Sequence, residues 1–241
     1  MQLRIVPGSL KDFERVMKFY ARERSDELPT PTAKDLATAL EDGRLLFVED
    51  QENQILATAA YIPITARSCL TVVGELTGTR VTDALNRGKP LNFQTLLLGL
   101  RVLHHIAYEG EPIPPGSYSI ITIVKKTNEP SYKNIVKSKF VEFKERPEWL
   151  RFDELSWHGK YVEDDWRYFY ATPETVRHLA NQLISNGLLS WHMNLEVRAG
   201  RASIHFEGFR SIAAAAPDLI AFSSGARKAK IVPPPQSLLF P

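Results

Sequence analysis

The chain has a single cysteine, Cys69, among its 241 residues. One cysteine cannot form a disulfide within the chain, and it cannot supply the several thiolates of a cysteine-rich zinc site. Neither kind of cross-link is therefore expected to stabilise the fold, and we expect a free, buried thiol at position 69.

Long apolar runs and blocks of one charge are also missing. No uninterrupted apolar run approaches the roughly 20 residues of a membrane-spanning helix, and the first residues lack the pattern of a signal peptide. The 30 basic and 28 acidic residues give a formal charge of +2, without a basic arm of the kind that binds nucleic acid. We therefore expect a cytoplasmic protein that neither spans a membrane nor binds DNA or RNA.

A hydrophobic content of 44% in 241 residues is enough for a sizeable core. The spacing of apolar residues, with period 2 in strands and 3.6 in helices, predicts the element order β-α-α-β-β-β-α-β-α-β for the first part of the chain. The expected strands cover residues 3–6, 45–48, 55–64, 69–76, 118–124 and 140–143, and the expected helices begin near residues 10, 32, 93 and 128.

The composition changes after residue 146, because all four tryptophans follow this point. We place a domain boundary there, with residues 1–146 in one domain and residues 147–241 in a small α+β domain with an extended tail. In the second part, Thr172 has the character of a helix cap and Gly187 that of a helix stop. Further elements are expected as a strand over 166–171, a hairpin over 191–206 and a short helix over 209–216.

A basic turn, Arg87-Gly88-Lys89, precedes the expected helix at residue 93. A helix start exposes backbone N–H groups without internal partners and carries a partial positive charge, so a phosphate is favoured there. Gly88 permits close approach, and the two cations add charge. The alternative is a purely structural turn, in which Asn92 caps a core helix.

The element order over residues 1–146 resembles the GNAT superfamily of acyl-CoA-dependent N-acyltransferases. In that family a strand ending in valine is followed by Arg-Gly-Lys-Gly-Ile-Gly or a variant, and then by a helix. Here Val81 precedes the sequence Arg-Gly-Lys-Pro-Leu-Asn at residues 87–92. A second family motif has Asn-x-x-Ala in the next helix, and then Tyr, Lys and a closing Gly-Phe. The positions that match it here are Asn128, Ser131, Lys137 and Phe140.

The resemblance implies a mixed, mostly antiparallel sheet flanked by helices, in the α/β (α+β) class. It also implies acetyl-CoA or another acyl-CoA as co-substrate, with its pyrophosphate at the basic turn. The pantetheine arm would lie beside residues 79–81, in a splay between the strands 69–76 and 118–124. The expected cofactor-binding residues are Val81, Arg87, Gly88, Lys89, Leu91, Asn92, Asn128 and Ser131.

The implied activity is direct transfer of an acyl group, expected to be acetyl, from CoA to the amine of a small molecule or a protein. Such transfer needs a base for the ammonium and an acid for the leaving thiolate. Glu75 on the strand beside the cofactor is the candidate base. Many family members supply the acid from a tyrosine at the place of Ile135, and Tyr132 is the candidate substitute.

Two departures from the family motif keep other functions open. Pro90 and Asn92 stand where the family has glycines, and proline lacks the backbone donor. A poor pyrophosphate loop fits an enzyme that takes acyl chains from an acyl carrier protein, and it also fits a non-catalytic binding or scaffolding protein of the same fold. A homodimer is left open, and no metal is expected, because neither His104-His105 nor the acidic run 163–165 has the spacing of a ligand set.

Overall fold

The computed structural model describes residues 1–23, 30–65, 71–86, 91–108, 117–146, 163–190, 192–207, 220–221 and 223–226. The strands are β1 (Gln2–Pro7), β2 (Leu45–Asp50), β3 (Ile55–Thr65), β4 (Thr71–Val81), β5 (Ser117–Lys125), β6 (Val141–Glu142), β7 (Trp166–Tyr170), β8 (His192–Val197) and β9 (Gly200–Phe206). The helices are α1 (Phe13–Arg22), α2 (Ala33–Glu41), α3 (Phe93–Tyr108), α4 (Glu129–Lys137) and α5 (Pro173–Ser185), with a short 3-10 helix, η2 (Asp83–Leu85).

One sheet contains all of these strands, in the order β6-β7-β5-β4-β3-β2-β1-β9-β8. Among the described strands, β4–β5 and β1–β9 are parallel pairs and the other neighbours are antiparallel. The predicted fold class, a mixed and mostly antiparallel sheet flanked by helices, is therefore confirmed.

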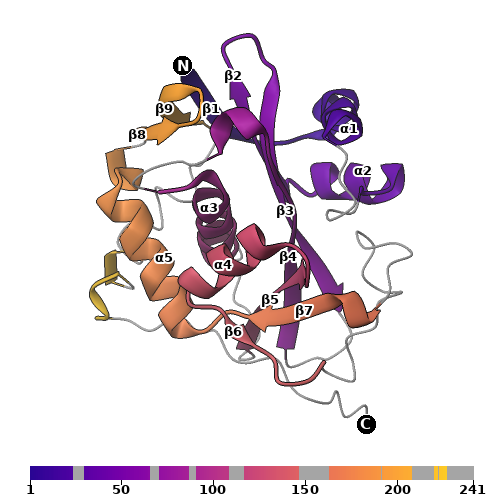
Figure 1. The fold of residues 1–241 in the computed structure, drawn as a ribbon, viewed down its shortest axis with the longest axis vertical. Helices are drawn as coiled ribbons and strands as arrows, with labels where there is room; N and C mark the ends of the chain where they lie inside the picture. The colour runs from indigo at the N-terminus through magenta and orange to yellow at the C-terminus, as the bar shows by residue number, and fades with distance from the viewer. Residues whose placement is uncertain are drawn as a thin grey trace.

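Helices cover both faces of the sheet (Figure 1): α1 and α2 lie on one face, and α3, α4 and α5 on the other. Alternation of side chains along the strands gives each face its own apolar cluster. On the α1–α2 side the cluster includes Phe19, Leu36 and Phe47. On the α3 side it includes Leu96 and Phe169. Within the described ranges, no helix combines the length and apolar character needed to cross a membrane.

The predicted order of elements over residues 1–146 is confirmed, and so are the predicted helix start near residue 32 and the predicted cap at Thr172. Thr32 accepts a hydrogen bond from the Asp35 amide at 3.2 Å, and Thr172 accepts one from the Thr175 amide at 3.2 Å. The strand expected to end at residue 76 instead continues to Val81, because Gly78 is accommodated in a bulge. Cys69 and the whole of the helix expected over 209–216 lie outside the described residues.

Strands from both sides of the expected boundary at residue 147 share the sheet. β7 lies between β5 and β6, and β9 pairs in parallel with β1. The division into two domains stays a prediction about folding units. In the folded molecule, the later segment supplies β7, which lies inside the β6 end of the sheet, and the strands β9 and β8 at the other end (Figure 1).

A buried carboxylate ties β1 and α1 to β2. Glu49 is 5% exposed and bonds to Arg15 and, at 2.6 Å, to Arg4. The side chains of Arg4 and Arg15 are 39% and 37% exposed. When the carboxylate is neutralised, water therefore hydrates both guanidinium groups and offsets part of the lost ion-pair energy. We expect Glu49→Gln to lower the free energy of unfolding by about 1–3 kcal/mol, measured by urea denaturation. The exposed pair Glu174–Arg177 is the control, since Glu174→Gln should change stability by less than about 0.5 kcal/mol.

Candidate functional site

The parallel strands β4 and β5 separate part-way along their length. Their pairing runs from Thr71 opposite Ser117 to Leu76 opposite Thr122. Beyond that point β4 continues to Val81, while β5 continues to Lys125 and pairs on its other side with β7. The Thr122 hydroxyl donates to the Leu76 carbonyl at 3.0 Å, at the level where the opening starts. The splay implied by the sequence resemblance is thus present between these strands.

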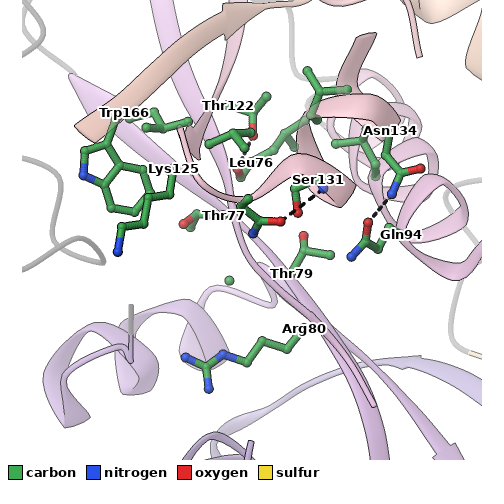
Figure 2. A pocket seen from close by; sticks show the side chains of 16 residues that line it. Leu76, Thr77, Thr79, Arg80, Gln94, Thr122, Lys125, Ser131, Asn134 and Trp166 are labelled. Carbon is green, nitrogen blue, oxygen red and sulfur yellow. Dashed lines mark hydrogen bonds between the residues drawn. The ribbon is translucent and has the colours of Figure 1, made fainter. Parts of the chain in front are cut away.

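A cavity of about 90 Å³ occupies this opening. Figure 2 shows Lys125 and Trp166 at one end, Gln94 and Asn134 at the other, and β4 between them. Its walls come from both strands, from α3 and α4, and from the start of β7. The lining residues are Leu76, Thr77, Gly78, Thr79, Arg80, Gln94, Leu98, Thr122, Ile123, Val124, Lys125, Asn128, Ser131, Asn134, Ile135 and Trp166.

A second cavity, of about 510 Å³, adjoins the first. The two share lining residues, among them Thr79, Asn128 and Ser131. The second cavity extends past the end of β4 to the starts of α3 and α4, where backbone N–H groups and the helix dipoles favour an anion. Together they form one cleft that is narrow and largely apolar between the strands and wider at the helix starts.

Side-chain amides hold the start of α3 against α4 at this cleft. Asn92 caps α3 by accepting from the Thr95 amide at 2.7 Å, and it donates to Asn134 on α4 at 2.8 Å. Asn134 in turn donates to Gln94 (Figure 2). Asn128 caps α4 by accepting from the Ser131 amide at 3.2 Å. Asn92 and Asn128 therefore both have the structural role of helix caps, and Asn128 and Ser131 also line both parts of the cleft.

A bulge in β4 turns one peptide group at the edge of the opening. One residue of β3, Ala59, lies opposite two of β4, Gly78 and Thr79, and Gly78 has φ +61°. The Gly78 carbonyl accepts from the Tyr20 hydroxyl at 2.8 Å and from the Thr58 hydroxyl at 2.9 Å. Because the C=O and N–H of a trans peptide point in opposite directions, the Thr79 N–H points away from these hydroxyls, toward the side of the opening that Thr79 lines.

Tyr20 is suited to hold this peptide. It is fully buried, and burial raises the pKa of Tyr20, so the phenol stays protonated and able to donate. Arg80 fixes α1 beside it, donating to the carbonyls of Tyr20 and Glu23 at the end of that helix, where a cation is favoured. Figure 2 shows the Arg80 side chain directed away from Thr122 and Ser131.

Glu75 lies on β4 just before the opening. It is 2% exposed and faces Ile62 of β3, which packs in the cluster on the α1–α2 side. Its side chain therefore projects to that face, as does that of Thr77, which lines the narrow cavity. Glu75 is not among the residues that line either cavity, and its role as a base stays a prediction.

The structure does not bring Tyr132 to the narrow cavity. Its ring packs against Phe169, with centroids 6.1 Å apart, and beneath the Arg167 guanidinium at 4.2 Å. Ile135, at the place where many family members have tyrosine, is among the lining residues instead. The residue that the sequence resemblance aligns with the family tyrosine therefore lies at the cavity and cannot donate a proton.

The other predicted cofactor residues have mixed outcomes. Val81 lines the wider cavity, and Leu91 is buried in the core below it. Arg87, Gly88 and Lys89 lie outside the described residues, so their contact with a phosphate stays a prediction.

Sequence reasoning missed several residues that line the cleft. Gln94 and Asn134 could have been found, because each is a polar residue next to apolar positions of a core helix. Trp166 and Arg198 come from segments distant in sequence, and no local pattern connects them to the cleft. In the described part of the chain, no three His, Cys, Asp or Glu side chains gather in a way that could hold a metal ion.

Solved structures share this architecture. No family model and no curated protein matches the sequence. The NatC complex bound to Gag peptide and CoA contains a chain 11% identical, with a TM-score of 0.50, over 70% of this chain and 96% of that one. A GNAT-family acetyltransferase from Streptococcus pneumoniae is 16% identical, with a TM-score of 0.47 and the same coverage of both chains. A diaminobutyrate acetyltransferase from Paenibacillus lautus is 11% identical, with a TM-score of 0.46, over 70% of this chain and 93% of its own. With its sheet order and splayed central strands, the chain has the fold of the GNAT N-acetyltransferases.

Proposed function

We propose that the protein is an N-acyltransferase that moves an acyl group from coenzyme A to an amine. The observation that carries the proposal is the cleft between β4 and β5, narrow and apolar along the strands and open at two helix starts. This shape suits a slender pantetheine arm in the narrow part and phosphates in the wide part, where the helix dipoles favour negative charge. The NatC structure, which shares the fold, contains CoA and a peptide.

Transfer would proceed by direct attack of the amine nitrogen on the thioester carbonyl carbon. The C–N bond forms, the carbonyl oxygen becomes an oxyanion, and the C–S bond then breaks to release the thiolate. The Thr79 N–H is the donor suited to the oxyanion, because the bulge turns it toward the opening and the bonds to Gly78 hold it there. Glu75 would accept the ammonium proton, directly or through water, and the nitrogen would lose its second proton to water as the C–S bond breaks.

Protonation of the thiolate would come from water. Tyr132 was the candidate acid, but its ring packs on Phe169 and Arg167, and it is not among the cavity-lining residues. A thiol has a pKa of about 8.5, so its thiolate leaves with little assistance near neutral pH. The transfer therefore does not require an acid at the place of Ile135.

Thermal denaturation with acetyl-CoA tests the cofactor part of the proposal. A ligand that binds the folded state at about 100 times its Kd should raise the Tm by roughly 5–10 °C. Thr79→Trp should abolish the shift, since the indole would fill the opening that Thr79 lines. Arg177→Trp, on an exposed position of α5, is the control and should keep the shift.

Turnover is the second test. Release of free CoA thiol from acetyl-CoA should depend on an added amine, measured across amino acids, polyamines and peptides with free N-termini. No Tm shift at millimolar acetyl-CoA would contradict the proposal and favour the non-catalytic alternative. An acyl-carrier-protein donor and a homodimer stay predictions from the sequence.

A further inference from the structure

The hairpin formed by β8 and β9 docks its turn on the segment between β4 and α3. The Arg198 amide donates to the Asn86 carbonyl at 2.9 Å, and the Ala199 amide donates to the Ala84 carbonyl at 3.1 Å. Two backbone hydrogen bonds therefore fix the turn against the segment that leads into the wide part of the cleft.

The docked turn places the Arg198 side chain at the wide cavity. Arg198 lines this cavity together with residues at the ends of β4, α3 and α4. Its described ion pair, to Asp83 on η2, uses Nη1, and its side chain is 52% exposed. A guanidinium has five N–H donors in a planar fork, so one contact with a carboxylate leaves it able to bind a second anion.

We propose that Arg198 binds a phosphate group of coenzyme A, so that the later segment of the chain supplies part of the cofactor site. The inference rests on the proposed function, because the pantetheine arm in the narrow cavity would bring the phosphates to the adjoining wide one. A phosphate contact from Arg198 would also compensate for the basic turn, where Pro90 stands in place of a family glycine and removes one backbone donor.

The position of Asp83 gives the proposal a distinctive consequence. The Asp83 carboxylate also lines the wide cavity, where it competes with a phosphate for the guanidinium and repels it. If Arg198 binds phosphate, removing Arg198 weakens CoA binding, whereas neutralising Asp83 strengthens it. If the ion pair only holds the hairpin against η2, either substitution breaks the same ion pair, and both should change CoA binding in the same direction.

The experiment is isothermal titration of the full-length protein with CoA, dephospho-CoA and pantetheine. Arg198→Ala should weaken CoA binding about tenfold, the range of a charge-assisted hydrogen bond, and should leave pantetheine binding unchanged. Asp83→Asn, which keeps a side-chain oxygen, should tighten CoA binding by about twofold to fivefold, in keeping with the exposure of both groups. The Arg198→Ala effect should shrink at high salt, and Arg198→Lys should recover part of the affinity.

Two comparisons complete the design. Loss of the Arg198→Ala effect with dephospho-CoA would assign the contact to the 3′-phosphate, and persistence of the effect would assign it to the pyrophosphate; both agree with the proposal. Arg177→Ala removes an equally exposed, acid-paired arginine on α5 and should leave CoA binding unchanged. Far-UV circular dichroism and the Tm without ligand confirm that each variant is folded.

The proposal is overturned if wild type binds CoA and Arg198→Ala binds it equally well, a result that leaves the proposed function standing. It is also overturned if Arg198→Ala and Asp83→Asn weaken CoA and pantetheine alike, since that marks a structural tie. A wild-type protein that binds neither CoA nor pantetheine overturns the proposed function itself.

Discussion

Glu75→Gln is expected to lower the rate of acyl transfer by about 10²–10⁴-fold, the range of a general base. Glu75 is 2% exposed, lies one residue before the opening between β4 and β5, and projects to the face opposite α3. Glutamine keeps the size and an oxygen acceptor but cannot take the proton from an ammonium group. The measurement is amine-dependent release of CoA thiol, with the acceptor that performs best in the turnover survey.

Two controls separate a loss of chemistry from a loss of folding. Glu75→Gln should still give the acetyl-CoA shift in Tm, because the substitution does not touch the phosphate end of the cleft. Glu49→Gln changes another buried carboxylate of the same sheet, and it should lower stability while leaving turnover intact below its Tm. Unchanged turnover in Glu75→Gln would show that Glu75 is not the base. It would not contradict the fold or the assignment of the cofactor cleft.

Gly78→Ala is expected to lower kcat by about 10²–10³-fold, the range for losing one oxyanion donor. At φ +61° a Cβ atom costs about 1–2 kcal/mol, and rotation of the peptide relieves this strain. The same rotation would break the hydrogen bonds from Tyr20 and Thr58 and turn the Thr79 N–H away from the opening. The readout is kcat with saturating acetyl-CoA.

The matched control is Gly43→Ala, in the turn between α2 and β2. Gly43 has φ +62°, and nothing lies within 4 Å of the added Cβ, so the backbone strain is alike and the site is remote. Both variants should lose similar stability, but only Gly78→Ala should lose kcat. Equal kcat in the two variants would show that the bulge peptide does not polarise the carbonyl.

Local patterns in the sequence were enough for the elements and their caps. Thr32, Asn128 and Thr172 cap helices because a side-chain oxygen within three residues of the exposed amides satisfies them, a relation that spacing alone reveals. The Thr-Gly-Thr at residues 77–79 misled the prediction, since glycine ends strands and also permits bulges. Only pairing with β3 distinguishes the two, and β4 continues through it.

The candidate site was accessible to sequence reasoning in part. Glu75 and Ser131 could be placed from the element order, because each lies near the end of an element whose neighbours in the sheet the family fold implies. Tyr132 could not be placed this way: its ring contacts Phe169 and Arg167 of β7, a strand that follows it by more than 30 residues. The spacing of three residues from Ile135 sets the side of the helix on which Tyr132 lies. Whether that side faces the cavity depends on the strand that packs against it.

The sequence by itself determined the helices, the strands, their order and the resemblance to an acyltransferase fold, because each depends on contacts between residues close in the chain. The tertiary structure decided which groups share the cleft. Asp83 and Arg198 are 115 positions apart and meet only because β9 pairs with β1 and its hairpin turn docks beside α3. This contact depends on the pairing of whole strands, so the periodicity of apolar residues within either segment cannot predict it.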